Sequence, residues 1–286
     1  MTRTLSVEIV LDARAELGEG PAWDAPAERL VWVDITGGTV HELRPNGATR
    51  SWKVDQHVGA AAPRASGGML LAVHDGFATL EDGGLRMLAP VEADKLENRM
   101  NDGKCDPQGR MWAGTMPYDE QGAGGALYRM DPDERVHTML TGTQISNGLC
   151  WSPDQRTMYY IDTPTLGVDA FDFDAPTGAI ANRRRVVTIE DGPGMPDGMT
   201  IDDEGCLWVA LFGGGQVRRY TPDGSLDAVV EAPASQTTSC AFGGPGRDEL
   251  YITSAARGKG DEEPHAGALF RCRPGVTGPA ATPYAG

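Results

Sequence analysis

Four short polar motifs along the chain carry side chains that could bind a cation. Each motif places an acid or an amide directly before a glycine and ahead of an apolar run: Glu19-Gly20, Asp102-Gly103, Asn147-Gly148 and Asp197-Gly198. Carboxylate and amide oxygens are the ligands that hard cations such as Ca²⁺, Mg²⁺ and Mn²⁺ prefer, and Zn²⁺ and Fe²⁺ also accept carboxylates. Carboxylates that converge repel one another unless a cation neutralises them. The motifs therefore predict a divalent-metal site, provided that the fold brings them together.

The elements that must position these motifs recur along the chain. A bulky apolar residue in a β-rich run returns at steps of 38, 42, 47, 49 and 43 residues, at Trp32, Leu70, Trp112, Tyr159, Trp208 and Tyr251. Six copies of roughly 40–50 residues are typical of the four-stranded blades of a β-propeller. The 38 Gly and 20 Pro suit its many tight turns. We therefore predict an all-β fold in which residues 1–286 form a single domain, one six-bladed β-propeller, and the run from Leu5 to Leu11 completes the last blade.

The propeller fold would gather the polar motifs at one place. The innermost strand of each blade lines the central channel, so equivalent positions of different blades meet near the axis. The second and sixth copies carry Val58-Gly59 and Ser239-Cys240 where the other four carry an acid or an amide. A single Asp-Gly or Asn-Gly pair is better explained as a hairpin turn. Four pairs at one register, one of them led by a glutamate, favour a ring of ligands that leaves open positions for water and substrate.

The composition argues against several classes of function. A formal charge of −16 argues against a nucleic-acid partner. No apolar run approaches the roughly 18–20 residues of a membrane helix, and the N-terminus lacks the apolar segment of a secretory signal. We therefore expect a cytoplasmic protein with no membrane partner, either a monomer or a weak dimer. The five cysteines are widely spaced and form no C-x-x-C pair, so we expect them to be buried and reduced.

Five segments together resemble the SMP-30/gluconolactonase family of regucalcin-like sugar lactonases. They are LGEGPAW, NRMNDGKCDPQGRMWAGTM, ISNGLCWSPD, PDGMTIDDEGCLWVA and TTSCAFGGP, in the family's order and across nearly the whole chain. The resemblance implies a six-bladed propeller that holds one divalent metal ion, Ca²⁺ in the first place and otherwise Mn²⁺, Zn²⁺, Mg²⁺ or Fe²⁺. The implied ligands are Glu19, Asn147 and Asp197, which leaves Asp102 near the ion without a direct bond to it.

The same resemblance implies where a substrate binds. Arg99 and Asn101, in the NRMND segment, are expected to hold it. An acidic, glycine-rich loop from Asp119 to Gly125 follows the AGTM segment, and within it Asp119 and Glu120 are candidate substrate contacts. Arg99 could instead form a structural ion pair with a neighbouring acid.

The predicted reaction is the hydrolysis of a sugar lactone to the corresponding aldonic acid. A lactone is a cyclic ester, so its hydrolysis needs an activated water and a stabilised oxyanion, and a divalent ion can provide for both. Asp197 is the candidate general base, and Arg99 and Asn101 supply donors for sugar hydroxyls or for the oxyanion. Two alternatives stay open: another ester or phosphotriester hydrolase on the same metal site, and a non-catalytic Ca²⁺-binding propeller.

Other catalytic schemes find little support in the sequence. It contains no His-Glu-x-x-His metalloprotease motif and no Gly-x-Ser-x-Gly elbow of a serine hydrolase. The histidines are scattered, and we expect them at surface or loop positions: His41, His57, His74, His137 and His265.

Overall fold

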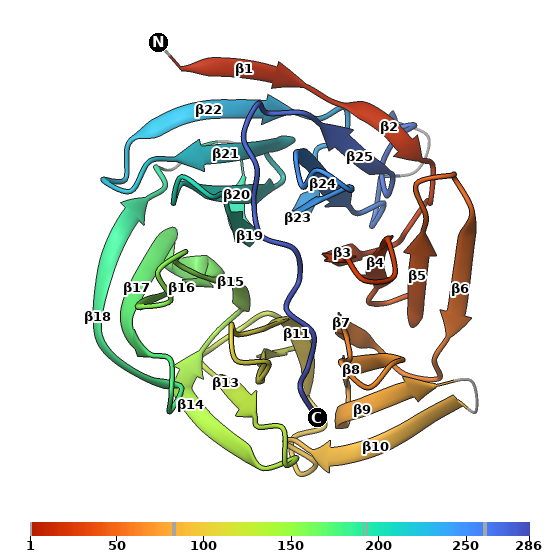
Figure 1. Ribbon diagram of the computed structural model, residues 1–286, viewed down its shortest axis with the longest axis vertical. Coiled ribbons are helices and arrows are strands. Elements are labelled where there is room, and N and C mark those ends of the chain that lie inside the picture. The colour runs from red at the N-terminus through yellow and green to blue at the C-terminus, as the bar shows by residue number, and fades with distance from the viewer. Residues whose placement is uncertain (1, 82–83, 191, 193, 260–261) are drawn as a thin grey trace.

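Six β-sheets stand around a central axis as the blades of a propeller (Figure 1). The computed structural model describes residues 2–81, 84–190, 192, 194–259 and 262–286. This arrangement confirms the predicted all-β, six-bladed β-propeller. Within the described ranges, no helix is long and apolar enough to cross a membrane.

The blades are numbered here in chain order, and their strands run outwards from the axis. Blades one to three comprise β3 (Gly18–Asp24), β4 (Arg29–Asp34), β5 (Thr39–Leu43) and β6 (Thr49–Lys53); β7 (Val58–Pro63), β8 (Met69–Val73), β9 (Gly76–Glu81) and β10 (Gly84–Pro90); and β11 (Asn98–Cys105), β12 (Met111–Pro117), β13 (Gly125–Met130) and β14 (Val136–Thr143). Blades four to six comprise β15 (Ser146–Trp151), β16 (Thr157–Asp162), β17 (Gly167–Asp174) and β18 (Ala179–Thr188), with the short 3-10 helix η1 (Thr163–Thr165); β19 (Met195–Ile201), β20 (Leu207–Phe212), β21 (Gln216–Tyr220) and β22 (Leu226–Glu231); and β23 (Thr237–Gly243), β24 (Glu249–Ser254) and β25 (Leu269–Cys272).

The N-terminal strands close the ring across two blades. Strand β2 (Glu8–Leu11) pairs antiparallel with β25 and so completes blade six, as predicted. Strand β1 (Arg3–Ser6) instead pairs parallel with β22 as a fifth strand of blade five. The prediction that the whole run from Leu5 to Leu11 belongs to the last blade is therefore wrong for Leu5 and Ser6. Because the two strands are consecutive, this segment ties blade five to blade six.

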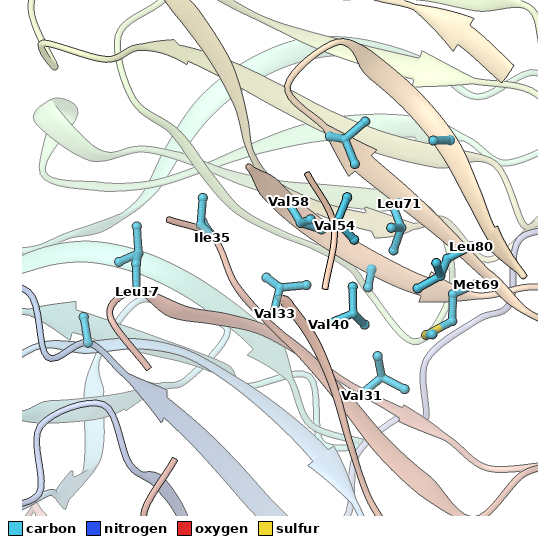
Figure 2. Packing of buried hydrophobic residues seen from close by; sticks show 14 residues of the cluster. Leu17, Val31, Val33, Ile35, Val40, Val54, Val58, Met69, Leu71 and Leu80 are labelled. Atoms are coloured by element: carbon cyan, nitrogen blue, oxygen red, sulfur yellow. The ribbon is translucent and has the colours of Figure 1, made fainter. Parts of the chain in front are cut away.

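The hydrophobic core lies between neighbouring blades, where the faces of adjacent sheets meet. Figure 2 shows one such layer, in which Val31 and Val33 of blade one pack with Val58 and Leu71 of blade two. β-branched and aliphatic residues fit this environment because their side chains alternate between the two faces of a pleated strand.

The recurring bulky residues lie in the second strand of each blade. Trp32, Trp112 and Trp208 are fully buried, as a packing role requires. In blade four the predicted position is off by one residue, because Tyr159 is partly exposed while its neighbour Tyr160 is buried. A shift of one residue along a strand turns a side chain to the other face of the sheet.

A turn of the form Asp-x-x-Gly joins the inner and second strands of blades three and five. In blade three, the amide of Gly109 donates to the carbonyl of Asp106, and Gly109 has a φ of 78° that favours glycine. The Asp106 carboxylate is fully buried and accepts from Arg110 Nε and from Trp112 Nε1, the latter at 3.0 Å. The acid therefore fixes the turn to the strand that follows it.

The C-terminal residues cross one end of the channel (Figure 1). Backbone amides of Gly278, Ala281, Tyr284 and Ala285 donate to carbonyls of Arg247, Trp23, Pro63 and Gly109, respectively, at 2.8–3.1 Å. These acceptors lie at the ends of the inner strands or in the turns that follow them, opposite the ends that carry the polar motifs. The segment, here called the strap (residues 273–286), therefore closes the channel on one side and leaves the polar motifs at the other mouth.

The cysteines lie where the sequence predicts. All five are free and buried, and Cys105, Cys150 and Cys240 lie on inner strands. Burial raises the pKa of Cys150 to about 12, so its thiol stays protonated at neutral pH.

Candidate functional site

A β-bulge shapes each inner strand where the polar motifs lie. The pairing between β11 and β12 shifts after Met100 and resumes at Gly103, and the corresponding shift occurs in all six blades. The residues left without a ladder partner include Asn101, Asp102, Asn147 and Asp197. Bulges redirect side chains and are common next to active sites. Here the bulges interrupt the regular alternation of side chains between the two faces of the sheet at these positions.

The glycines of the motifs serve the close approach of neighbouring inner strands. A Cβ on Gly148 would lie 2.7 Å from the carbonyl oxygen of Asp197, and one on Gly198 would lie 2.1 Å from Ser239 Oγ. Neither glycine has a positive φ, and both lie within strands. The hairpin-turn interpretation of these two pairs is therefore wrong, because the motif glycines are needed to pack one blade against the next around the axis.

Three carboxylates of the motifs share one buried region. Glu19, Asp102 and Asp197 are 5%, 4% and 7% exposed. Burial raises the pKa of Glu19 well above its usual value, and the negative charges of Asp197 and Asp102 raise it further. Burial and the charge of Asp102 likewise raise the pKa of Asp197. The three acids are therefore close enough to repel one another in a medium that stabilises charge poorly.

Positive charge near these acids comes from two side chains of blade three. The Arg99 guanidinium lowers the pKa of Glu19 and of Asp197, but less than burial raises it. Burial raises the pKa of Asp102, and the Lys104 ammonium opposes that rise. Lys104 Nζ donates to the carbonyl of Met199 at 2.8 Å. It lines a cavity of about 110 Å³ that reaches from the motifs towards the strap, so Asp102 has a cation of its own inside the channel.

Asn147 offers an oxygen that nothing in the described structure satisfies. Its Nδ2 donates to Thr163 Oγ1 at 3.0 Å, and Thr163 Oγ1 donates in turn to the carbonyl of Pro196 at 2.8 Å. Because the threonine hydroxyl gives away its only hydrogen, it must accept from the amide, and this fixes the orientation of the amide. Asn147 Oδ1 is then buried with no hydrogen-bond partner among the described residues. Such a group costs roughly 1–3 kcal/mol unless it is satisfied.

Here the four motif side chains that carry oxygen, Glu19, Asp102, Asn147 and Asp197, are called the channel cluster. An unsatisfied amide oxygen beside mutually repelling carboxylates is a donor set that a divalent cation would complete. All of the donors are oxygens, which suits Ca²⁺, Mg²⁺ or Mn²⁺. The residues present therefore fit the metal that the sequence predicts.

Arg99 and Asn101 lie beside the channel cluster and are hydrogen-bonded to each other. Arg99 Nη1 donates to Asn101 Oδ1 at 2.7 Å, and Asn101 Nδ2 donates to the carbonyl of Ser146 at 2.8 Å. Both side chains are buried. Among the residues that the structure describes, Arg99 makes hydrogen bonds with Asn101 and with the carbonyl of Met100, and no ion pair. The alternative of a structural ion pair at Arg99 is therefore not supported.

Asp119 and Glu120 occupy a loop at the same mouth, but their described contacts are with protein. Asp119 is exposed and accepts from the backbone of Gln121 at 2.9 Å. Glu120 forms an ion pair with Arg257 at 3.2 Å, which connects this loop to the one that follows β24. The charge of Glu120 also acts on the pKa of Arg99, so the loop lies near the guanidinium. A substrate contact for these two acids stays a prediction.

The structure also brings together three residues that the sequence did not associate. The Tyr118 hydroxyl lies 3.0 Å from His57 Nδ1 and 3.1 Å from His74 Nδ1. Burial raises the pKa of Tyr118 and lowers that of His57, and the charge of Arg99 opposes the first shift and adds to the second, so the group lies near Arg99. The histidines were expected at scattered surface or loop positions. No motif announces this group, because its members come from two different blades.

A second acidic group lies in blade five. Potential ligand atoms of Asp202, Glu204 and Cys206 lie within 4.8 Å of one another. Here, however, Arg219 already supplies a cation: it bonds Asp202 at 2.8 Å and Asp227 at 2.7 Å, and it also pairs with Glu204. These three acids around Arg219 are called the blade-five cluster. Each of its acids is paired with Arg219, and Asp227 also pairs with Arg3, so these acids have cationic partners within the described structure.

Comparison with known proteins finds relatives of this chain both in sequence and in fold. A family model described as the SMP-30/Gluconolactonase/LRE-like region matches residues 17–256. Regucalcin from Xenopus laevis is 40% identical, over 99% of each chain. The crystal structure of a calcium-binding protein, regucalcin, from Agrobacterium tumefaciens superposes with a TM-score of 0.94 at 30% identity, over 99% of each chain. A gluconolactonase from Xanthomonas campestris gives a TM-score of 0.76 at 26% identity, covering 93% of this chain and 88% of that chain.

Proposed function

The chain belongs to the SMP-30/gluconolactonase family, and on that premise we propose that it is a metal-dependent sugar lactonase. In this proposal, Glu19, Asn147 and Asp197 hold one divalent cation, with Ca²⁺ the first choice. The substrate is a sugar lactone, and the product is the corresponding aldonic acid. The gluconolactonase named among the structural relatives supports this class of reaction.

The observation that carries the proposal is the unsatisfied oxygen of Asn147 beside two acids with raised pKa values. A protein that only needed a stable channel could fill these positions with apolar residues or pair them internally, as blade five does. Retaining unbalanced, buried carboxylates lowers the stability of the metal-free protein. This cost is expected where a bound cation supplies the missing charge.

The chemistry follows from the types of side chain present. When bound, a divalent ion would polarise the ester carbonyl and increase the acidity of a coordinated water. Asp197 accepts the proton from the attacking water as general base, a role that typically contributes roughly 10²–10⁴-fold. Arg99 and Asn101 hold the substrate or its oxyanion with N–H donors, and their mutual hydrogen bond keeps them in place before the substrate arrives. Asp119 and Glu120 are proposed to lie at the rim of the same site.

A non-catalytic calcium-binding propeller is the second candidate, because a structural relative is described as a calcium-binding protein. The buried guanidinium of Arg99, which forms no ion pair with the described residues, favours an enzyme, since ion binding alone does not call for a cation beside the ligands. Another ester or phosphotriester hydrolase on the same cluster would need the same residues, so only a choice of substrates can separate it from a lactonase.

The decisive experiment is a substrate panel with the metal-free protein, re-supplied with Ca²⁺, Mn²⁺, Zn²⁺, Mg²⁺ and Fe²⁺ in turn. The panel holds glucono-, xylono-, arabinono- and galactonolactone, together with a simple aryl ester and a phosphotriester. We expect lactone hydrolysis only with metal. Full activity after thorough metal removal would contradict the mechanism. Metal binding with no turnover of any substrate would favour the calcium-binding propeller.

A further inference from the structure

Three side chains meet at the mouth of the channel beside the proposed active site. Tyr118 follows β12, His57 precedes β7, and His74 lies in the turn between β8 and β9. The tyrosine hydroxyl bonds the Nδ1 atom of both imidazoles, at 3.0 and 3.1 Å, and its ring contacts both imidazole rings. They are called the rim group. It joins blade three to blade two, and nothing in the proposed reaction requires it.

The rim group stands over the blade where the channel cluster has a gap. His57 directly precedes Val58-Gly59, the copy of the motif that carries no oxygen ligand. Val58 pairs with Val73, so the backbone brings His57 and His74 to the same end of blade two. The charges of Arg99 and Glu16 both act on the pKa of His57. Because Arg99 belongs to blade three and Glu16 lies in the loop before β3 of blade one, His57 lies at the mouth between these two blades. A substrate held by Arg99 would therefore extend over blade two.

The hydrogen bonds fix opposite tautomers on the two histidines. A hydroxyl has one hydrogen to donate and can accept another, so one imidazole accepts from Tyr118 through a bare Nδ1 and the other donates through Nδ1–H. His74 Nε2 lies 3.9 Å from a carboxylate oxygen of Asp75, too far for a hydrogen bond, and the negative charge of that acid favours the hydrogen on Nε2 and a bare Nδ1. His57 then donates to Tyr118 through Nδ1, which leaves its Nε2 bare.

The surroundings keep His57 neutral. Burial lowers its pKa and the positive charge of Arg99 lowers it further, while Glu16 opposes them weakly. A neutral imidazole with a bare Nε2 is a hydrogen-bond acceptor. Arg99 and Asn101, by contrast, offer N–H donors from the other side of the mouth. Donors on one side and an acceptor on the other match a polyol, in which every hydroxyl both donates and accepts.

We propose that the rim group is a binding subsite for the hydroxyl groups of the substrate that lie away from the ester, with His57 Nε2 accepting a hydrogen bond from one of them. This inference rests on the proposed lactonase function and names the part of the substrate that the rim recognises. It makes His57, His74 and Tyr118 determinants of specificity for polyhydroxylated lactones over unsubstituted ones.

The test compares D-glucono-δ-lactone with δ-valerolactone, which has the same six-membered lactone ring but carries none of the hydroxyl or hydroxymethyl groups. Tyr118→Phe removes the hydroxyl that fixes both tautomers, and His57→Phe removes the acceptor. Each variant should lower the ratio of kcat/KM for the glucono-lactone to kcat/KM for valerolactone by about fivefold to tenfold, the size of one hydrogen bond. His57→Gln, which keeps an amide oxygen as acceptor, should restore part of the ratio. Tyr159→Phe, on the surface of blade four, is the matched control and should leave the ratio unchanged.

Calorimetry gives a readout that does not depend on turnover. Titrating the metal-loaded protein with the non-hydrolysable glucono-lactam should show about fivefold to tenfold weaker binding in Tyr118→Phe and His57→Phe, again the size of one hydrogen bond. The affinity for Ca²⁺ should be equal in all variants. An unchanged ratio and unchanged lactam binding would overturn the inference, as would equal losses for both lactones accompanied by weaker Ca²⁺ binding. If the wild-type protein hydrolyses no lactone, the lactonase proposal fails, and the lactam titration alone decides whether the rim binds a polyol.

Discussion

The channel cluster and the blade-five cluster contain the same chemistry in two different electrostatic settings. The channel cluster gathers three buried carboxylates on inner strands, whereas the blade-five cluster has one buried carboxylate, Asp202, with the more exposed Glu204 and Asp227 beside it. In blade five the carboxylates close around Arg219, and the buried Asp202 accepts from Arg219 Nε at 2.8 Å and from Trp208 Nε1 at 2.9 Å. In the channel, Glu19 and Asp197 have no cation bonded to them among the described residues. Acidity alone therefore does not distinguish the two clusters as candidate metal sites, whereas the missing counter-charge in the channel does.

The blade-five arrangement recurs within the fold, which supports a structural role. In blade three, Asp106 holds Arg110 Nε and Trp112 Nε1 just as Asp202 holds Arg219 and Trp208. The two acids begin equivalent Asp-x-x-Gly turns. Because this Asp–Arg–Trp arrangement recurs in two blades whose other residues differ, its role is structural: it holds neighbouring strands together. The channel cluster, by contrast, draws its members from four different blades and exists only because the ring closes.

The largest expected effect concerns catalysis at the channel cluster. Asp197→Asn keeps the size of the side chain but removes the general base and one negative charge. We expect kcat/KM for lactone hydrolysis to fall by about 10³-fold, because a general base contributes roughly 10²–10⁴-fold. Steady-state kinetics with saturating metal measures the loss.

A matched acid of the blade-five cluster is the control for this substitution. Glu204 is exposed at the edge of that cluster, so Glu204→Gln should leave kcat/KM within about twofold, since exposed ion pairs contribute little. Comparable losses in the two variants would show that activity depends on the fold in general, and the assignment of Asp197 would be wrong.

The second-largest expected effect is on stability, and it concerns the blade-five cluster instead of the channel cluster. In Asp202→Asn, the new amide N–H₂ faces donors from Trp208 and Arg219 and leaves a buried guanidinium without its partner. We expect the free energy of unfolding to fall by about 3 kcal/mol, as when one partner of a buried pair is removed. Chemical denaturation measures the change.

The control is Asp154→Asn, in an exposed turn of blade four, which should lower the free energy of unfolding by less than about 1 kcal/mol. A stable Asp202→Asn protein with reduced metal binding would mean that blade five holds the ion.

The sequence predicts the architecture well because the repeat is long and regular. Six recurring apolar positions are enough to predict six blades, and the equivalent positions of the four polar motifs predict that the channel cluster lies at one mouth. What it does not predict depends on contacts between distant segments. The parallel pairing of β1 in blade five leaves no local pattern, and neither does the strap, whose backbone amides bond several blades.

The rim group illustrates the same limit. His57, His74 and Tyr118 meet only because β7 pairs with β8 and because blade three stands beside blade two. Separately, each is an unremarkable surface residue. The sequence also does not show which acids have a cationic partner. Asp197 stands directly before a glycine and Asp202 three residues before one, and only the fold shows that Asp202 is bonded to an arginine.

The third effect is on the stability of the metal-free protein and depends on pH. Because burial raises the pKa of Asp102, the folded protein binds this proton more tightly than the unfolded chain does. Its contribution to stability is therefore greatest below the usual carboxyl pKa and is lost as the pH rises through the folded-state value. We expect Asp102→Asn to stabilise the metal-free protein at pH 7–8 by roughly 1 kcal/mol, in the range of single substitutions. The difference should disappear at acidic pH, where the native acid is neutral.

Denaturation of both proteins in chelator across the pH range measures this difference. A destabilised Asp102→Asn protein at neutral pH would mean that Lys104 balances Asp102 fully, as Arg219 balances Asp202. The channel cluster would then contain two uncompensated acids and not three.

The smallest effect tests whether the loop acids act through the protein or on the substrate. Glu120 pairs with Arg257 at 3.2 Å, and both side chains are about half exposed, so the pair contributes less than about 1 kcal/mol to stability. If the pair orders the two loops at the mouth, Glu120→Gln and Arg257→Gln should each raise KM by about threefold, equivalent to less than 1 kcal/mol, with kcat unchanged. Measuring KM for both variants and for the double variant separates the two roles. A double variant no worse than either single variant supports a loop tether, because the two residues then act through one interaction. A rise in KM confined to Glu120→Gln would instead mean that Glu120 contacts the substrate directly, as proposed for the rim of the site.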